Sequence, residues 1–412
     1  MSPLRFTSLR AVSLAHFSVD LLNSLGAVVF TFMSAHLLSL TKTQIGLAAS
    51  LYALVGSLSQ PLFGYLADKN GGRSLGVWSM VWLPVLLMTA YFVGAATGSF
   101  ELMLAFYVVA SLGSAAFHPM GALHASGGDK TRAARNLSYF FLAGQLGLAL
   151  GPLLVGWMLA QTLAITPDGS LLPLLIFTPL VLPGMWAMQR SLPGEAQYTE
   201  ARQRDASASS GKLTIPVKLL LFLAAVVALR SLSTPGAAPF IPIMFEAKGW
   251  TPESYGFITS MYWLATALSP LLASRLSERF GSRAVIGATL LLGAPMFWFL
   301  PQSDGIVAVL LALLGGGLTG ASHSIIVAEG QRIMPSGKGF ASGAVMGFIF
   351  GTGALGSLII GALSDSVGIT IAFEIVAVVT VVAAVLGWLL PDSTPARTAA
   401  PVAQPAPAPS GD

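Results

Sequence analysis

The stretch Gly64-Tyr65-Leu66-Ala67-Asp68-Lys69-Asn70-Gly71-Gly72-Arg73 is a short charged turn between two long apolar runs. A second copy, Ser274-Arg275-Leu276-Ser277-Glu278-Arg279-Phe280-Gly281-Ser282-Arg283, follows 210 positions later. When the copies are aligned, an acid meets an acid, a base meets a base and a glycine meets a glycine. One charged turn of this kind is common. Its repetition at the same place in each half of the chain predicts a duplicated helix bundle.

The composition places this bundle in lipid. Of the 412 residues 54% are hydrophobic and 9% are charged, and the mean hydropathy is +0.76. Soluble domains carry about 25% charged residues, so this chain lacks the polar surface of a water-soluble globule. No cysteine is present, which excludes disulfides and thiolate metal sites.

Twelve apolar runs are long enough to cross a membrane as helices, which need about 20 residues each. Barrel strands would instead be alternating segments of about 10 residues. We therefore predict an all-α membrane protein with twelve transmembrane helices in two pseudo-symmetric six-helix halves. The predicted spans are 11–33, 44–66, 75–96, 102–124, 136–160, 171–189, 215–243, 253–275, 284–301, 306–331, 340–363 and 369–390.

The distribution of basic residues predicts the orientation. With the N-terminus inside, 18 of the 21 Lys and Arg residues lie inside and only Lys42 and Lys248 lie outside, while Arg230 lies within a span. This bias follows the positive-inside rule, so both termini are expected in the cytoplasm and the protein in the cytoplasmic (inner) membrane. It also explains the basic pI, so nucleic acid is not expected as a partner.

The polar segments divide the chain. We predict an N-terminal six-helix half over 1–189, a cytoplasmic linker over 190–214 and a C-terminal half over 215–390. The Pro- and Ala-rich residues 391–412 have almost no large apolar side chains, and we expect a disordered cytoplasmic tail.

These features together resemble the major facilitator superfamily. The first charged turn matches that family's Gly-x-x-x-Asp-(Arg/Lys)-x-Gly-x-(Arg/Lys) signature, while the second departs from it at Ser274 and Glu278. Span five resembles the Gly-x-x-x-Gly-Pro signature found mainly in the family's antiporters. The residues concerned, which we expect to form a helix-packing motif, are Gly147, Gly151, Pro152 and Gly156.

Four shorter matches resemble one branch of the family, the fosmidomycin-resistance-type efflux proteins. They are Ala15-His16-Phe17 with Asp20, Gln60-Pro61, Phe117-His118-Pro119-x-Gly121 and Gln331-x-x-x-Pro335. The resemblance implies a transporter rather than an enzyme, working by alternating access. It also implies that spans one, four, seven and ten line a central cavity.

Ionisable residues within the spans are the candidates for proton coupling. Asp20 and His16 are one turn apart on span one, and a charged carboxylate at bilayer depth needs a cavity, a partner or a proton. His118 and His323 lie at matching positions of spans four and ten, and Glu329 follows near the end of span ten. Buried helix-packing residues are the alternative interpretation of each.

Arg230 is the one basic residue deep within a span. A guanidinium does not lose its charge, so it needs an anion. We expect Asp20 to be that anion in the empty protein and the substrate to supply it when bound. Substrate binding is therefore assigned to Arg230, Asp20, His118 and His323. His16, His118 and His323 come from three helices without a carboxylate at a telling spacing, so no metal site is expected.

The two charged turns are the candidates for a conformational gate. Asp68 is expected at the N-terminus of span eleven near Phe340, and Glu278 at the start of span five near Asn136, where each meets a positive helix dipole. A simple span boundary is the alternative interpretation. The gate residues are Gly64, Asp68, Lys69, Arg73, Glu278, Arg279 and Arg283.

We therefore predict a monomeric, proton-coupled secondary transporter in membrane lipid that exports a small drug- or antibiotic-like molecule, anionic or amphipathic. It needs no cofactor and is driven by the proton gradient. Alternatives with the same fold are proton-coupled anion uptake and lipid or glycolipid flipping. A receptor or an integral-membrane enzyme is the alternative of another class, but the sequence shows neither a clustered acid–base set nor a nucleotide-binding loop.

Overall fold

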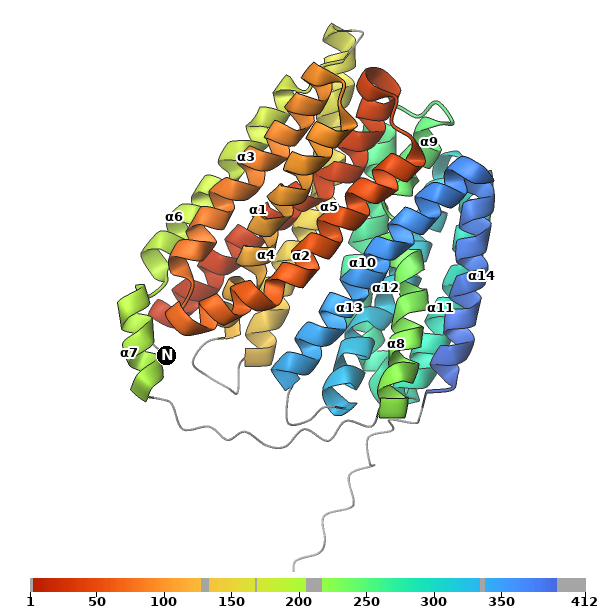
Figure 1. The fold of residues 1–412 in the computed structure, drawn as a ribbon. Helices are drawn as coiled ribbons and strands as arrows, with labels where there is room; N and C mark the ends of the chain where they lie inside the picture. Colours follow the sequence, from red (N-terminus) through yellow and green to blue (C-terminus); the bar gives the residue numbers. More distant parts are fainter. Residues whose placement is uncertain (1–2, 127–132, 167–168, 205–216, 334–337, 391–412) are drawn as a thin grey trace, which may run out of the picture.

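The computed structural model describes residues 3–126, 133–166, 169–204, 217–333 and 338–390, and in these ranges every regular element is helical (Figure 1). Residues 205–214 of the predicted linker and the predicted tail 391–412 lie outside the described residues. The helices of the N-terminal half are α1 Pro3–Met33, η1 Ser34–Leu38, α2 Lys42–Asn70, α3 Arg73–Thr97, α4 Phe100–Ser126, α5 Ala133–Ile165, η2 Leu172–Val181 and α6 Leu182–Ser191.

The second half follows a short helix, α7 Glu195–Arg204. Its helices are α8 Val217–Ser231, η3 Leu232–Gly236, α9 Phe240–Glu246, α10 Pro252–Phe280, α11 Ser282–Phe299, η4 Leu300–Gln302, α12 Gly305–Ile333, α13 Lys338–Ser366 and α14 Ile369–Trp388. Within the described residues, eleven helices are long and apolar enough to span a membrane, or twelve if the bent α8–α9 segment counts as one span. The twelve-helix prediction is confirmed.

Backbone geometry explains the repeated glycines of the two charged turns. α2 ends at Gly71, which has a φ of +77° and whose N–H donates to the carbonyl oxygen of Ala67. α10 ends at Gly281, with a φ of +86°. Residues with a Cβ rarely adopt a backbone conformation with positive φ. Glycine is therefore the residue that ends each helix, and the next helix begins within two positions.

The seventh span is broken, which differs from the continuous helix predicted over 215–243. The chain passes from α8 through the π-helical η3 into α9 with a bend of 42°. Pro235 and Pro239 lack the N–H groups that a continuous helix needs there. Two backbone carbonyl oxygens at the break are bonded from a neighbouring helix, since Tyr262 Oη of α10 donates to Ser233 O and Thr234 O. This is how non-helical backbone is tolerated at membrane depth.

Two further differences concern the middle of the chain. The sixth span begins as a 3₁₀ helix, η2, in a segment that contains Pro173 and Pro179. The predicted linker loop contains α7, whose Tyr198 packs against Gly71 at the end of α2. A polar helix of ten residues carries little apolar periodicity, so hydrophobic patterning does not indicate it.

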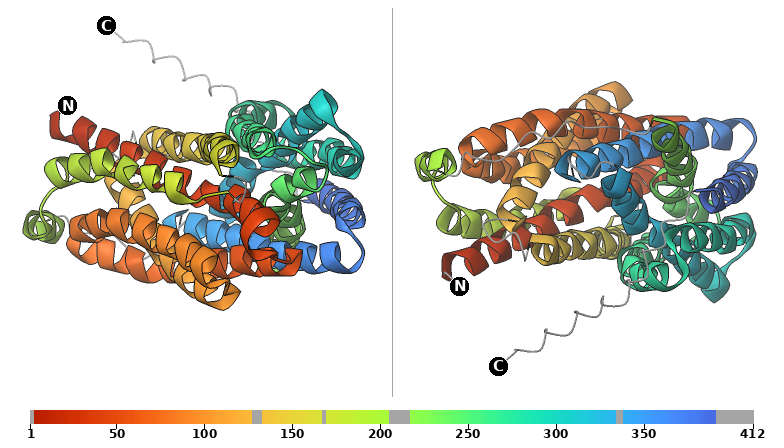
Figure 2. Two further views of the ribbon diagram at one scale, coloured as in Figure 1. Left: turned by 90° about the horizontal axis from the view of Figure 1, so that it is seen from above. Right: turned by 90° about the horizontal axis from the view of Figure 1, so that it is seen from below.

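The two halves lie side by side, and the most extensive contacts between them join α5 to α10 and α2 to α13 (Figure 2). We call the end of the bundle where α1 begins and α14 ends the termini face, and the opposite end the far face. The contacts between halves lie toward the far face: a Cβ on Gly156 of α5 would meet Pro252 and Gly256 of α10, and one on Gly46 of α2 would meet Ser357 of α13.

Toward the termini face the same helices separate. The ribbons of α2 and α13 diverge in this direction (Figure 1). Leu58 of α2 is 78% exposed, and a Cβ on Gly347 of α13 would meet no atom of the described residues within 4 Å apart from its own helix backbone. The halves are therefore joined at the far face and parted at the termini face.

Candidate functional site

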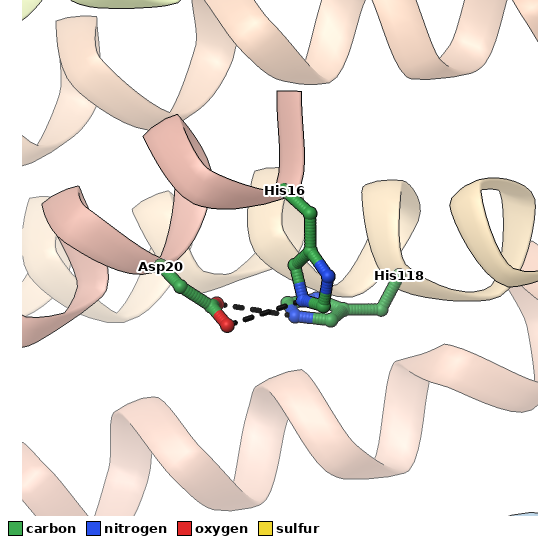
Figure 3. A group of neighbouring side chains, drawn as sticks. All are labelled: His16, Asp20 and His118. Atoms are coloured by element: carbon green, nitrogen blue, oxygen red, sulfur yellow. Dashed lines mark ion pairs between the residues drawn. The ribbon is translucent and has the colours of Figure 1, made fainter. Parts of the chain in front are cut away.

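Three ionisable side chains predicted from the sequence form one cluster inside the N-terminal half (Figure 3). His16 and Asp20 come from neighbouring turns of α1, and His118 comes from α4. Asp20 lies between the two imidazoles, with its Oδ2 3.1 Å from His16 Nε2 and its Oδ1 3.2 Å from His118 Nε2. We call these three residues the proton cluster.

Each imidazole of the proton cluster is held at its other nitrogen by a backbone carbonyl. His16 Nδ1 lies 2.8 Å from Phe140 O, and His118 Nδ1 lies 2.7 Å from Ser114 O. The ring of Phe140 also stacks on His16, with centroids 4.0 Å apart. His16 is buried, whereas the His118 side chain is 25% exposed. His118 is therefore the most solvent-exposed member of the cluster.

Neutral polar groups complete the environment of Asp20. Asn23 Nδ2 donates to Asp20 Oδ1 at 3.1 Å and to Ser114 Oγ at 2.9 Å, while Tyr52 Oη donates to Asn23 Oδ1 at 2.6 Å. This chain of hydrogen bonds links α1 to α2 and α4. Asn23 and Tyr52 were not predicted as site residues, although Asn23 lies one turn beyond Asp20 and shares its helix face.

α5 packs closely on α1, and the missing side chain at Gly144 of α5 leaves the space that the cluster occupies. A Cβ on Gly144 would lie 2.5 Å from Asp20 Oδ2 and from His16 Nε2. One turn apart, Gly147 and Gly151 lie against the α1 backbone at Phe17 and Leu21. The predicted packing motif thus has two roles in the structure, because its last glycine, Gly156, instead faces α10 of the other half.

The C-terminal half buries a permanent cation in the corresponding place. Arg230 of α8 is 1% exposed, and its Nε and Nη2 donate to Thr319 O, with Nε also reaching Ser322 Oγ of α12 at 3.1 Å. Its Nη1 is buried without a hydrogen-bond partner among the described residues. His323 follows Ser322, the α12 residue whose hydroxyl accepts from Arg230 Nε.

The predicted ion pair between Asp20 and Arg230 is wrong. Asp20 is paired with His16 and His118 instead, and no ion pair to Arg230 occurs among the described residues. Each charged group has found partners within its own half: imidazoles from α1 and α4 for Asp20, and α12 oxygen atoms for Arg230. His323 is likewise separated from the other histidines. The expectation of no metal site stays a prediction.

The gate residues lie at the termini face. A Cβ on Gly64 would lie 3.5 Å from the Cβ of Pro119 on α4, and Arg73 Nη1 donates to Leu192 O. The other five gate side chains are exposed: Asp68, Lys69, Glu278, Arg279 and Arg283. The predicted contacts of Asp68 with span eleven and of Glu278 with span five stay predictions. Glu329, also predicted for proton coupling, is buried near the end of α12.

A carboxylate at the far face was missed. Asp365, in the last turn of α13, accepts hydrogen bonds from the backbone N–H groups of Lys42 and Thr43 at 3.1 and 2.7 Å, and from Thr43 Oγ1 at 2.6 Å. It thereby caps the first turn of α2. The signal was present, since Gly361 precedes Asp365 with the same spacing as Gly64 precedes Asp68, and Gly361 lies against the Lys42 backbone.

The duplicated bundle is matched by comparison with known proteins. The family model of the Major Facilitator Superfamily matches residues 12–234 and again residues 220–411. The chain belongs to this superfamily. The signature turn of this facilitator, its two six-helix halves and its broken seventh span are therefore parts of a transporter fold, and the prediction that the chain is not an enzyme is confirmed.

Individual relatives show which members of the superfamily the chain resembles. The facilitator is 26% identical over 401 residues to the fosmidomycin resistance protein of Escherichia coli (strain K12), covering 94% of this chain and 93% of that protein. It is 27% identical over 402 residues to the uncharacterized MFS-type transporter YfnC of Bacillus subtilis (strain 168), with the same coverage. The predicted branch resemblance is confirmed.

Among solved structures, a mutant form of the nucleoside transporter NupG superimposes with a TM-score of 0.71, covering 93% of this facilitator and 99% of that chain. The identity is 15%, so this likeness concerns the fold alone.

Proposed function

We propose that this facilitator is a proton-coupled secondary transporter that exports a small molecule by alternating access. The observation that carries the proposal is the proton cluster, a carboxylate buried between two histidines on α1 and α4. Ionisable groups at membrane depth are costly to hold there and commonly mark proton or ion pathways. The transporter needs no cofactor, is driven by the proton gradient and works as a monomer.

The substrate would bind where the two halves meet around the first and fourth helix of each. Arg230 supplies a fixed positive charge, and its Nη1 amino group has no hydrogen-bond partner among the described residues, while His323 follows Ser322, which bonds Arg230 Nε. An anionic or amphipathic molecule would provide the counter-ion that Arg230 lacks among the described residues. Asp20 and His118 would contact it from the opposite half.

The packing between the halves supports alternating access. If the termini are cytoplasmic, as the basic residues predict, the closed far face is the outer side and the parted termini face is the inner side. Rocking of one half against the other would break the contacts of α2 with α13 and of α5 with α10 and expose the site outward. Asp68 and Glu278 would then close the inner side.

The name of the relative in Escherichia coli supports export of a phosphonate drug as the direction to test first. The antiporter-type packing motif over Gly147, Gly151 and Pro152 is consistent with this direction. Proton-coupled anion uptake is the second candidate, favoured by the Nη1 group of Arg230, which has no partner in the described part of the chain.

Inverted membrane vesicles, energised to be acid inside, test the proposal. Fosmidomycin and a hydrophobic dye such as ethidium are added while collapse of the pH gradient is followed. Collapse in the wild type and in Glu101→Gln, but not in Asp20→Asn, supports antiport through the proton cluster. Glu101 is a matched control, because its carboxylate is exposed and, within the described ranges, accepts only a local bond from Ser99. An equal response in all three proteins rules out Asp20 as the coupling residue.

A further inference from the structure

The proton cluster contains four hydrogen-bond contacts of imidazole nitrogens, and each contact needs a hydrogen atom. His16 Nδ1 faces a backbone carbonyl oxygen, and so does His118 Nδ1. A carbonyl oxygen only accepts, so both Nδ1 atoms carry hydrogen. The two Nε2 atoms each face an oxygen of Asp20 at 3.1 and 3.2 Å.

Each Nε2-to-carboxylate contact also needs its own hydrogen. Without one, a nitrogen lone pair and an oxygen lone pair would face each other at hydrogen-bond distance, which is repulsive. Two hydrogens at Nδ1 and two at the carboxylate contacts make four, whereas two neutral imidazoles beside an ionised carboxylate hold two. The observed geometry therefore holds two additional protons.

Basicity decides on which atoms these two protons lie. Each can sit on nitrogen or on oxygen of its contact, and imidazole is the stronger base, with unperturbed pKa values of about 6.5 for His and 3.9 for Asp. Asp20 Oδ1 in addition accepts a hydrogen bond from Asn23 Nδ2, which favours the ionised carboxylate. The histidines therefore carry the protons, and the carboxylate is the fixed anion between them.

We propose that the cluster is a two-proton carrier in which His16 and His118 load and release the protons while Asp20 stays ionised. In terms of the proposed function, on which this inference rests, two protons enter for each molecule exported. Loading changes the charge of the cluster from −1 to +1, and release restores it. No covalent bond other than N–H is formed or broken.

The groups that face the proton cluster are uncharged, so no neighbouring charge offsets the change from −1 to +1. Tyr52 from α2, Asn23 from α1 and Ser114 from α4 are its polar neighbours, and α5 contributes the carbonyl of Phe140 and the space at Gly144. Among the described residues, no Lys or Arg forms an ion pair with Asp20. Proton binding at one imidazole is thus felt at the other chiefly through the carboxylate that both contact.

The protonation states are measurable without transport. The chain has five histidines, so 15N-histidine NMR of the full chain in lipid nanodiscs, purified without a histidine tag, gives few signals. His16→Gln and His118→Gln assign the signals, and His36 is the internal control. We expect both His16 and His118 to be doubly protonated at mildly acidic pH and to lose a proton in two coupled steps. In Asp20→Asn both should be neutral at pH 7.

A transport measurement then counts the protons. In proteoliposomes clamped at zero membrane potential with potassium and valinomycin, the fosmidomycin gradient that balances a pH gradient of one unit is measured. Two coupled protons sustain a gradient of about 100-fold, and one proton sustains about tenfold. His118→Gln should lower the balance point to tenfold or abolish it.

The outcomes separate the inference from the function on which it rests. A tenfold wild-type gradient, or a neutral His16 or His118 from pH 5 upward, overturns the two-proton carrier and leaves proton-coupled export intact. No drug gradient at any pH difference overturns the export function, and the NMR states then still decide whether the cluster holds two protons.

Discussion

Replacing Asp365 by asparagine should weaken the seal at the far face. The carboxylate accepts three hydrogen bonds from Lys42 and Thr43, and it lies 3.7 Å from Lys42 Nζ, with both side chains about one-third exposed. Asparagine keeps one acceptor oxygen and loses the second oxygen and the charge.

The size of the effect follows from these contacts. Loss of a capping side chain costs about 0.5–2 kcal/mol, and a negative charge at a helix N-terminus contributes about 0.3–1 kcal/mol. The Lys42 pair adds little at this exposure. We expect a loss of about 1–2 kcal/mol from the far-face-closed state, which is a shift of about 5- to 30-fold toward far-face opening.

Pulsed electron paramagnetic resonance can measure this shift, because the chain has no cysteine and accepts a labelled pair without background. Spin labels at Thr97→Cys and Gln302→Cys report the separation of the halves at the far face. The population at longer distance should rise in Asp365→Asn and stay unchanged in Glu101→Gln. An unchanged distribution in Asp365→Asn would refute the capping argument, as would an equal change in the control.

Three further substitutions test other contacts. Gly144→Ala should abolish drug-dependent collapse of the pH gradient by displacing the carboxylate of the proton cluster, whereas Gly347→Ala, where a Cβ meets no other atom within 4 Å, should not. Tyr262→Phe should lower the free energy of unfolding by about 1–3 kcal/mol, because Ser233 O and Thr234 O lose the bond from this hydroxyl, although Thr234 O keeps the backbone N–H of Ala238. Tyr255→Phe should have a smaller effect in the same denaturation assay, because the Tyr255 hydroxyl is buried without a hydrogen-bond partner among the residues that the structure describes. Gly156→Val should part the α5–α10 contact and lengthen the far-face distances between the same spin labels; an unchanged distance would contradict the close packing seen there.

The fold could be predicted from the sequence because its signals are strong and local. Span length, charge bias and the repeated turn each depend on neighbouring residues, and the glycines of the turn reflect a backbone conformation that other residues rarely adopt. The break of the seventh span was also signalled, by Pro235, Gly236 and Pro239, but hydropathy alone does not distinguish a broken span from a continuous one.

The site could be predicted only within single helices. The His16–Asp20 pair follows from a four-residue spacing, which fixes a shared helix face. Partners on different helices depend on how each helix is rotated about its axis, and a helix that is apolar all round gives no such information. For this reason His118 was found as a candidate but not as a partner of Asp20, and Arg230 was given the wrong counter-ion.

The break in the seventh span also limits how much of the protein must move when Arg230 moves. Residues 232–239 form a joint between α8, which carries the guanidinium, and α9, whose side chains are buried at the far face. A rod of uninterrupted helix would transmit any tilt along its whole length. With the joint, α8 need not tilt together with α9, so the hydrogen bonds between Arg230 and α12 can change without repacking the buried far-face end of the span.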